Sequence, residues 1–134
     1  MNIQSSKGKK GYRGYIFSRK IEDNFIPQRV QNLVIKDFAS RKKLFFKLSA
    51  TEYKMENCFL MLNSTLKNLK SIEGMIFYSL FMLPKKNIDR KKILDKFIKK
   101  KKKLFFALEE ISVTTVKDLK KINDIFNLKK ILKN

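Results

Sequence analysis

Short apolar runs alternate with longer segments that are apolar on one face, and this alternation covers most of the chain. A short apolar run between polar residues is typical of a buried strand, whereas an i, i+3, i+4, i+7 spacing is typical of a helix that covers a sheet. Gly74 directly precedes the third of these apolar runs and marks its start. The pattern predicts four strands, at about 14–18, 44–49, 75–78 and 103–108.

Each predicted strand is followed by a predicted helix. Pro27 suits the first turn of one helix, and the second is expected over about 55–70. Asn87 is a candidate cap for the third, and Thr115 with Asp118 resembles a capping pair for the last. In this last helix four apolar side chains are predicted to point inward: Leu119, Ile122, Phe126 and Leu128.

Nearly continuous apolar strands separated by helices predict an α/β fold. We expect a single three-layer domain over 13–134, with a mainly parallel four-stranded sheet and helices on both faces, in a Rossmann-like arrangement. Residues 1–12 are predicted to be a flexible basic tail. Right-handed crossovers place all four strand ends at one edge of the sheet, where ligands of open α/β sheets bind.

Polar side chains gather where the predicted strands end. Glu52 is a candidate acid or base because a carboxylate at a strand end can be partly desolvated, although it could equally be an exposed loop acid. Tyr53 and Ser18 are the other candidate catalytic residues, but a serine in a loop often only satisfies nearby backbone. The candidate ligand-binding residues, including predicted helix amino ends at Gln28 and Asn57, are Arg19, Gln28, Asn32, Ser49, Thr51, Asn57, Ser79 and Glu109.

The chain carries a formal net charge of +20, with 32 Lys and Arg against 12 Asp and Glu. Such a charge favours a polyanionic partner. Lysine predominates over arginine, however, and Ile, Asn and Phe are abundant, as expected when an AT-rich genome biases codon usage. A nucleic-acid partner is therefore considered, but it is not the first choice.

Histidine is absent and there is one cysteine, Cys58. The composition excludes Ser-His and Cys-His nucleophile pairs and argues against a zinc site, so no metal and no cofactor are predicted. A lone cysteine fits a reducing compartment. The longest apolar stretch, Met75 to Leu83, is shorter than the ~20 residues that a membrane span needs. We expect a cytoplasmic protein without a membrane span.

Five segments of the chain together resemble the sporadic carbohydrate cluster protein family. Those segments are Arg13–Arg19, Pro27 with Val30–Val34, Leu48–Cys58, Phe77–Pro84 and Phe106–Glu109. Members of that family are small bacterial proteins encoded near genes for surface carbohydrate biosynthesis, and the family name implies no reaction. The resemblance implies a protein of that pathway which binds a sugar phosphate or nucleotide sugar at the carboxyl edge of the sheet.

A more distant resemblance, to the catalytic domain of serine recombinases, rests on a serine at the end of the first strand. In that family a Tyr-x-x-x-Ser pattern precedes the nucleophile, and Gly14 stands here at the position of its tyrosine. The family carries an arginine two residues before the serine and more arginines beyond the third strand. This chain has Ile16 at the first place and Leu80–Pro84 near the second. The resemblance implies a resolvase-like fold and puts DNA cleavage in doubt.

These observations leave three functions open. The first is sugar-phosphate binding, with Glu52 and Tyr53 as acid and base. The second is a recombinase-like nucleic-acid-binding domain that lacks the catalytic arginines. The third is a non-catalytic partner of a glycan enzyme, which exposed side chains at Phe81, Met82 and Leu83 would favour as an interface. A second copy of the chain is also considered as a partner.

Overall fold

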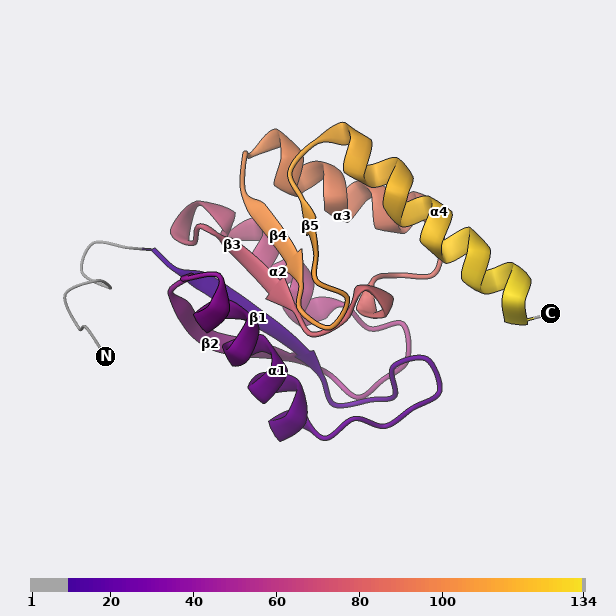
Figure 1. Cartoon of the computed structure of the whole chain (residues 1–134), viewed down its shortest axis with the longest axis horizontal. Coiled ribbons are helices and arrows are strands. Elements are labelled where there is room, and N and C mark those ends of the chain that lie inside the picture. The colour runs from indigo at the N-terminus through magenta and orange to yellow at the C-terminus, as the bar shows by residue number, and fades with distance from the viewer. Residues whose placement is uncertain (1–9, 134) are drawn as a thin grey trace.

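Strands and helices alternate along the chain, as the sequence predicts (Figure 1). The computed structural model describes residues 10–133. The elements are β1 (Tyr12–Phe17), α1 (Gln28–Arg41), β2 (Phe46–Glu52), α2 (Leu60–Lys67), β3 (Gly74–Phe77), α3 (Asn87–Lys99), β4 (Lys103–Phe106), β5 (Ile111–Val113) and α4 (Val116–Lys133). Two short 3₁₀ turns lie at Leu69–Ser71 and Leu80–Met82. The predicted tail lies mostly outside the described residues, and Tyr12 already belongs to β1.

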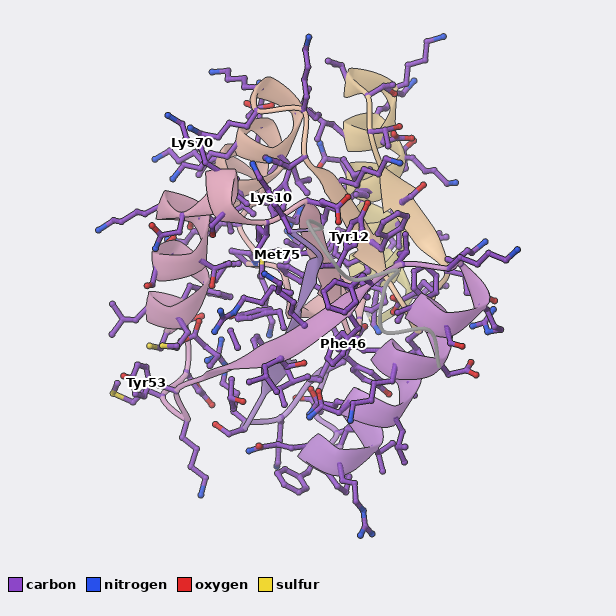
Figure 2. The ribbon with its side chains drawn as sticks, turned by 90° about the vertical axis from the view of Figure 1, so that its left-hand side faces the viewer. Lys10, Tyr12, Phe46, Tyr53, Lys70 and Met75 are labelled. Atoms are coloured by element: carbon purple, nitrogen blue, oxygen red, sulfur yellow. The ribbon has the colours of Figure 1, made fainter. Side chains whose placement is uncertain are left out.

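The strands form one sheet in the order β2-β1-β3-β4-β5. The first four strands are parallel, and β5 runs antiparallel to β4. The single α/β domain and its parallel sheet are therefore confirmed, and β5 is an addition that the sequence analysis missed. Helix α1 covers one face, α2 and α3 cover the other, and α4 passes the β5 edge and packs on α3 (Figures 1 and 2).

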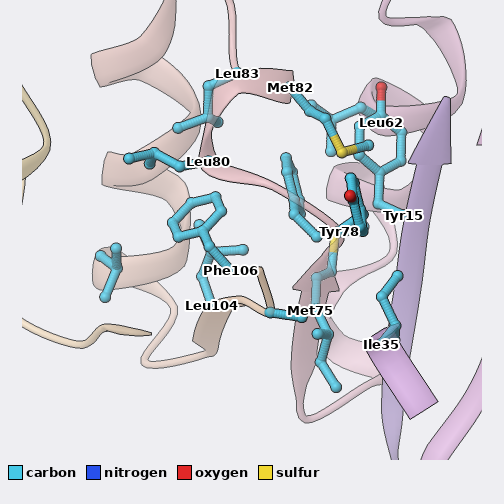
Figure 3. Close-up of a cluster of buried hydrophobic side chains, with 14 of the residues drawn as sticks. Tyr15, Ile35, Leu62, Met75, Tyr78, Leu80, Met82, Leu83, Leu104 and Phe106 are labelled. Carbon is cyan, nitrogen blue, oxygen red and sulfur yellow. The ribbon is translucent and has the colours of Figure 1, made fainter. Parts of the chain in front are cut away.

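The core lies on both faces of the sheet, and Figure 3 shows part of it, with Ile35 of α1 and Leu62 of α2. Its largest members are aromatic and long aliphatic side chains with relative exposures of 0% to 2%. Burying each such side chain stabilises the fold by roughly 1.5–3 kcal/mol. Members labelled in Figure 3 include Tyr15, Leu62, Met75, Leu80, Met82, Leu104 and Phe106. This packed core fixes the positions of the strand ends, where the loops at the carboxyl edge begin.

Strand β2 departs from the prediction of a buried strand. It occupies the edge of the sheet, and the Leu48 side chain is 83% exposed. An edge strand pairs on one side only, so its apolar run does not require burial on both faces. The strand also continues to Glu52, which places Thr51 inside the strand rather than after its end, and Ser49 in its middle rather than at its end.

Two helices also differ from the pattern. Helix α2 begins at Leu60, because the chain makes a loop through Asn57, whose φ is 59°, and the Met55 side chain is 62% exposed in that loop. In α4, Ile122 is fully buried as predicted, but Leu128 is 57% exposed. In this part of the helix Phe126 and Lys129 contact the Phe81 ring, and Leu128 does not belong to the core. In both helices the apolar spacing continues past the residues that are buried.

Candidate functional site at the carboxyl edge

A hollow of about 580 Å³ opens at the carboxyl edge of the sheet. It lies where strand order reverses, because the chain runs from β1 outward to β2 and then returns past β1 to β3. The loops after β1, β2 and β3 supply most of its wall, including Ser18, Arg19, Lys54 and Phe81. The hollow therefore occupies the part of the fold where the sequence analysis placed a site.

Glu52 ends β2 with its side chain 1% exposed. Its Oε1 accepts hydrogen bonds from the Tyr15 hydroxyl at 2.7 Å and from the Leu62 backbone N–H at 3.1 Å. Its Oε2 accepts from the backbone N–H groups of Tyr53 and Met61, both at 3.0 Å. The carboxylate thus joins β1, β2 and the first turn of α2.

These contacts also determine the charge on Glu52. Burial raises the pKa of the carboxyl group, but the hydrogen bonds from Met61, Tyr15, Leu62 and Tyr53 favour the charged form, and the pKa of Glu52 ends below its usual value. The Cys58 thiol is a fifth donor, to Oε2 at 3.8 Å. A carboxylate with a lowered pKa and five donors is a weak proton acceptor. The amino end of α2, which the sequence analysis offered to an external anion near Asn57, is instead bound by Glu52.

Ser18 and Arg19 hold the loop between β2 and α2. The Ser18 hydroxyl donates to the Glu52 carbonyl at 2.8 Å. Nη1 of Arg19 donates to the carbonyl oxygens of Tyr53, Met55 and Cys58 at 2.9, 3.1 and 2.9 Å. The Arg19 guanidinium carbon also lies over aromatic rings, 4.0 Å from the centroid of Phe17 and 5.1 Å from that of Phe59. Both side chains therefore bind backbone groups of their own chain, and Arg19 also binds two of its rings.

Gln31 was missed by the sequence analysis, although it organises the loop after β1. Its side chain is fully buried. The amide oxygen accepts from the Phe17 N–H at 2.9 Å, and the amide nitrogen donates to the carbonyl oxygens of Phe17 and Ile26 at 2.9 and 2.8 Å. In an amphipathic helix a polar residue is expected on the exposed face, so the sequence did not indicate that Gln31 is buried.

Ser79 and Glu109 lie together at the other side of the carboxyl edge. The Ser79 hydroxyl donates to Oε2 of Glu109 at 2.6 Å, and the Leu80 N–H donates to Oε1 at 2.8 Å. Ser79 also accepts from the Phe81 N–H at 3.2 Å. Together these bonds fasten the 3₁₀ turn after β3 to the loop after β4. Burial and the charge of Glu109 raise the pKa of the neighbouring Tyr78 hydroxyl.

Most of the remaining candidates lie apart from these two clusters, and only Tyr53 belongs to the first. Ser49 donates to Oδ1 of Asn32 at 2.7 Å, which ties the middle of β2 to α1. Thr51 is half-buried within β2, and Tyr53 is 52% exposed beside the loop (Figure 2). Gln28 begins α1 as an exposed residue. The structure therefore brings Ser18, Arg19, Glu52 and Tyr53 into one group, joins Ser79 to Glu109, and separates Gln28, Asn32 and Ser49 from both.

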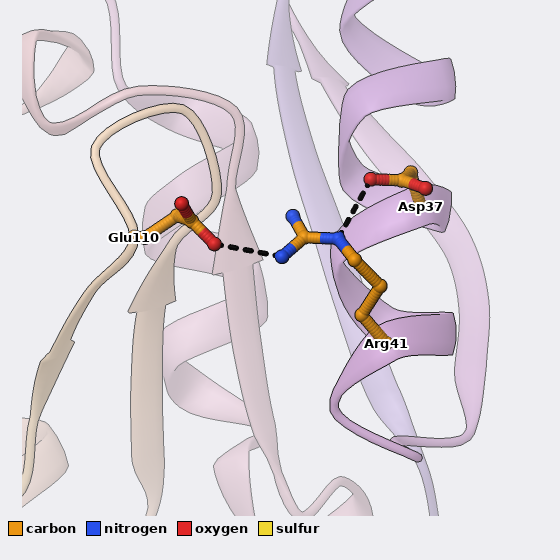
Figure 4. Close-up of polar contacts among 3 residues, drawn as sticks. All are labelled: Asp37, Arg41 and Glu110. Atoms are coloured by element: carbon orange, nitrogen blue, oxygen red, sulfur yellow. Dashed lines mark hydrogen bonds and ion pairs between the residues drawn. The ribbon is translucent and has the colours of Figure 1, made fainter.

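Arg41 connects α1 to the turn between β4 and β5 (Figure 4). Its Nη1 lies 2.7 Å from a Glu110 oxygen, and its Nε lies 2.9 Å from an Asp37 oxygen. Hydrogen bonding to Arg41 lowers the pKa of Glu110, and the hydrogen bonds to Glu110 and Asp37 raise the pKa of Arg41. All three residues are exposed, so the contact orients the turn more than it stabilises the fold.

Arg90 fixes the segment that leads into α3. The side chain is 2% exposed, and Nη1 donates to the carbonyl oxygens of Pro84 and Lys85 at 3.1 and 2.7 Å. Its guanidinium carbon lies 3.9 Å from the centroid of the Phe126 ring in α4. Burial lowers the pKa of Arg90. Met82 and Leu83, considered above as interface residues if exposed, are 0% and 2% exposed and belong to the core.

The described residues offer neither a cluster of metal ligands nor a membrane-spanning helix. No group of three or more His, Cys, Asp or Glu side chains among residues 10–133 is placed to hold a metal ion. In the same part of the chain, no helix has the length and apolar character needed to cross a membrane.

Comparison with solved structures decides the fold. The N-terminal catalytic domain of TP901-1 integrase matches with a TM-score of 0.59 at 17% identity, over 91% of this chain and 99% of that one. The chain has the fold of a recombinase catalytic domain. A resolvase family site-specific recombinase from Streptococcus pneumoniae matches with a TM-score of 0.62 at 10% identity, over 89% of this chain and 88% of that one.

These matches concern the recombinase fold alone, because both identities are low. No protein family profile matches the sequence, and no curated protein is significantly similar to it. The expected membership of the sporadic carbohydrate cluster family therefore has no support. The weaker resemblance noted in the sequence, to the recombinase catalytic domain, correctly identified the fold.

Proposed function

We propose that this chain is a nucleic-acid-binding domain that keeps the recombinase fold without its strand-cleavage chemistry. The observation that carries the proposal is the position of the Ser18 hydroxyl, which donates to the Glu52 carbonyl at 2.8 Å. Phosphoryl transfer requires cations around the transferring group. At the places where the recombinase resemblance calls for arginines, this chain has buried apolar side chains such as Ile16 and Leu83.

Charge and fold support the binding part of the proposal. The chain carries 32 Lys and Arg against 12 Asp and Glu, and excess positive charge attracts nucleic acid by releasing its counterions. The similar structures are an integrase catalytic domain and a site-specific recombinase. At the carboxyl edge, Lys20, Lys54 and Lys85 line the hollow as exposed residues.

The proposal is tested by measuring the binding of labelled DNA as a function of salt, together with cleavage of a supercoiled plasmid. We expect binding that weakens steeply with salt, by about 10³-fold or more between 50 and 200 mM if six or more phosphates are contacted. The plasmid should stay intact, with no covalent protein–DNA adduct. Ser18→Ala should bind as the native protein does.

The competing hypothesis is that the chain binds a sugar phosphate or nucleotide sugar, and a second experiment tests it. A thermal-shift series with nucleotide sugars and sugar phosphates reports any ligand that binds the native state. A shift with one of these sugars, in a protein that binds no DNA at low salt, would overturn the nucleic-acid proposal. Plasmid cleavage that Ser18→Ala abolishes would overturn its non-catalytic part.

A further inference from the structure

The hollow at the carboxyl edge continues into a second hollow of about 590 Å³ that runs along α3. The two share four lining residues: Asn57, Phe59, Pro84 and Lys85. We call the combined surface the basic groove. It extends from Phe25, in the loop after β1, to Lys96 in α3.

Lysines dominate the part of the basic groove along α3. Lys85, Lys86, Lys92 and Lys96 line it as exposed residues, against one acid, Asp89. Lys92 and Lys96 are four residues apart in α3, so they lie on the same face of the helix, about 6 Å apart along its axis. Arg90 binds the carbonyl oxygens of Pro84 and Lys85, which fixes the start of this lysine row.

An exposed aromatic ring lies at the other end of the basic groove. Phe25 lines the carboxyl-edge hollow with 61% of its side chain exposed. Acids also line this end, namely Glu22, Asp23 and Glu56, and their three negative charges equal the three positive charges of Arg19, Lys20 and Lys54. This end therefore offers a flat apolar surface more than a net charge, in contrast to the end along α3.

A positively charged groove combined with an exposed aromatic ring is how proteins bind single-stranded nucleic acid, because the cations follow the backbone and the ring stacks on a base. A duplex keeps its bases stacked on each other and presents its phosphates, so it can use the lysines but not the ring. We infer that the basic groove binds a single strand, with Lys85, Lys86, Lys92 and Lys96 on the backbone and Phe25 against a base. This inference rests on the proposed function.

The test uses fluorescence anisotropy of the full chain with a labelled oligo(dT) of about 20 nucleotides and with a duplex of the same length. We expect the single strand to bind at least about tenfold more tightly than the duplex. Phe25→Ala should weaken single-strand binding by about tenfold and leave duplex binding unchanged, since stacking on one ring contributes about 1.4 kcal/mol. Phe25→Leu, which stays apolar but has no ring face, should weaken it similarly.

A matched pair of quadruple variants locates the backbone contacts. Replacing Lys85, Lys86, Lys92 and Lys96 by Gln should lower single-strand affinity by about 100-fold and reduce the slope of log K against log salt by about three units. Replacing four exposed lysines outside the groove by Gln removes the same net charge, and this control should change the slope far less. The control positions are Lys36, Lys117, Lys120 and Lys121.

The possible results distinguish the inference from the proposed function. Duplex binding as tight as single-strand binding, or Phe25→Ala without effect, would overturn the inference and leave nucleic-acid binding standing. Equal losses in the two quadruple variants would overturn the location in the groove. Failure to bind either nucleic acid at low salt would overturn both. Thermal unfolding of each variant confirms that it is folded.

Discussion

The Tyr15 hydroxyl, from the interior strand β1, donates a 2.7 Å hydrogen bond to Glu52 at the end of the neighbouring edge strand β2. Burial, and then the hydrogen bond and charge of Glu52, hold the pKa of Tyr15 above its usual range, so the hydroxyl stays protonated. The same carboxylate receives two N–H groups from the first turn of α2. A residue that the sequence analysis placed in a catalytic role thus fastens three elements together.

Glu52→Gln should lower the free energy of unfolding by about 2–3 kcal/mol at pH 7, because an amide replaces a charged acceptor of several buried donors. Tyr15→Phe should lower it less, by about 1 kcal/mol, since Glu52 keeps its backbone donors. Urea unfolding measures both. The exposed neighbour Glu56→Gln is the control and should be neutral. A neutral Glu52→Gln would show that these hydrogen bonds contribute nothing.

The same carboxylate makes stability depend on acid pH. The folded pKa of Glu52 lies below its unfolded value, so its contribution is complete above the unfolded pKa, about 4.3, and is lost as pH falls through the folded pKa. The native protein should therefore lose stability relative to Glu52→Gln as pH falls below about 4.5. Urea titrations of both proteins between neutral and acid pH measure the difference. Parallel pH curves would contradict the lowered pKa.

Gln31→Leu should destabilise the protein by about 2–4 kcal/mol. The substitution leaves the Phe17 N–H and two carbonyl oxygens buried without partners. Each such group costs its full desolvation free energy, which is larger than the net contribution of the hydrogen bond that is lost. Gln28→Leu, at the exposed start of the same helix, is a matched control and should have little effect. Chemical denaturation compares them. Equal midpoints would mean that the loop after β1 is held by other contacts.

Arg19→Lys should loosen the loop between β2 and α2 although it preserves the charge. The planar guanidinium of Arg19 binds three carbonyl groups while its flat face lies over Phe17 and Phe59. A lysine ammonium is not planar and cannot make both kinds of contact. Hydrogen exchange should become faster over residues 53–59 and stay unchanged in α4, which lies outside these contacts. Unchanged exchange over 53–59 would show that the charge alone orders this loop.

Ser79 and Glu109 should be energetically coupled. A double-mutant cycle with Ser79→Ala and Glu109→Ala is expected to give an interaction energy of about 1 kcal/mol, because the hydroxyl donates to a charged oxygen at 2.6 Å. The pair Asn32 and Ser49, which is half-buried and uncharged, should give a smaller value. Additive effects at Ser79 and Glu109 would mean that other contacts hold the two loops.

The sequence predicted the layers of the fold well and the partners within the site poorly. Apolar runs identified the four parallel strands, and parallel order alone placed Ser79 and Glu109 at one edge. The run that contains Leu48 looks the same in a central or an edge strand, so its exposure could not be predicted. Strand β5 has three residues, too few to show an alternating pattern.

The hydrogen-bond partners of Glu52 could not be predicted from the sequence for a related reason. Three of its donors are backbone N–H groups, at Tyr53, Met61 and Leu62, and backbone groups carry no residue-specific signal. The positions of the Met61 and Leu62 groups became available only because α2 starts at Leu60 instead of residue 55, and that shift depends on the left-handed turn at Asn57. Local spacing predicts that a helix exists more reliably than it predicts where the helix starts.

The capping of α2 by Glu52 has a consequence for engineering this fold. Exposed N–H groups at a helix start ordinarily attract phosphate, and here the chain fills that position with its own carboxylate, as an internal ligand. A variant with a shorter, uncharged side chain at residue 52 would vacate the position beside Tyr15 and Arg19. The design of a phosphate-binding site at this sheet edge would therefore start with removal of the Glu52 carboxylate, which already occupies the N–H groups at the start of α2.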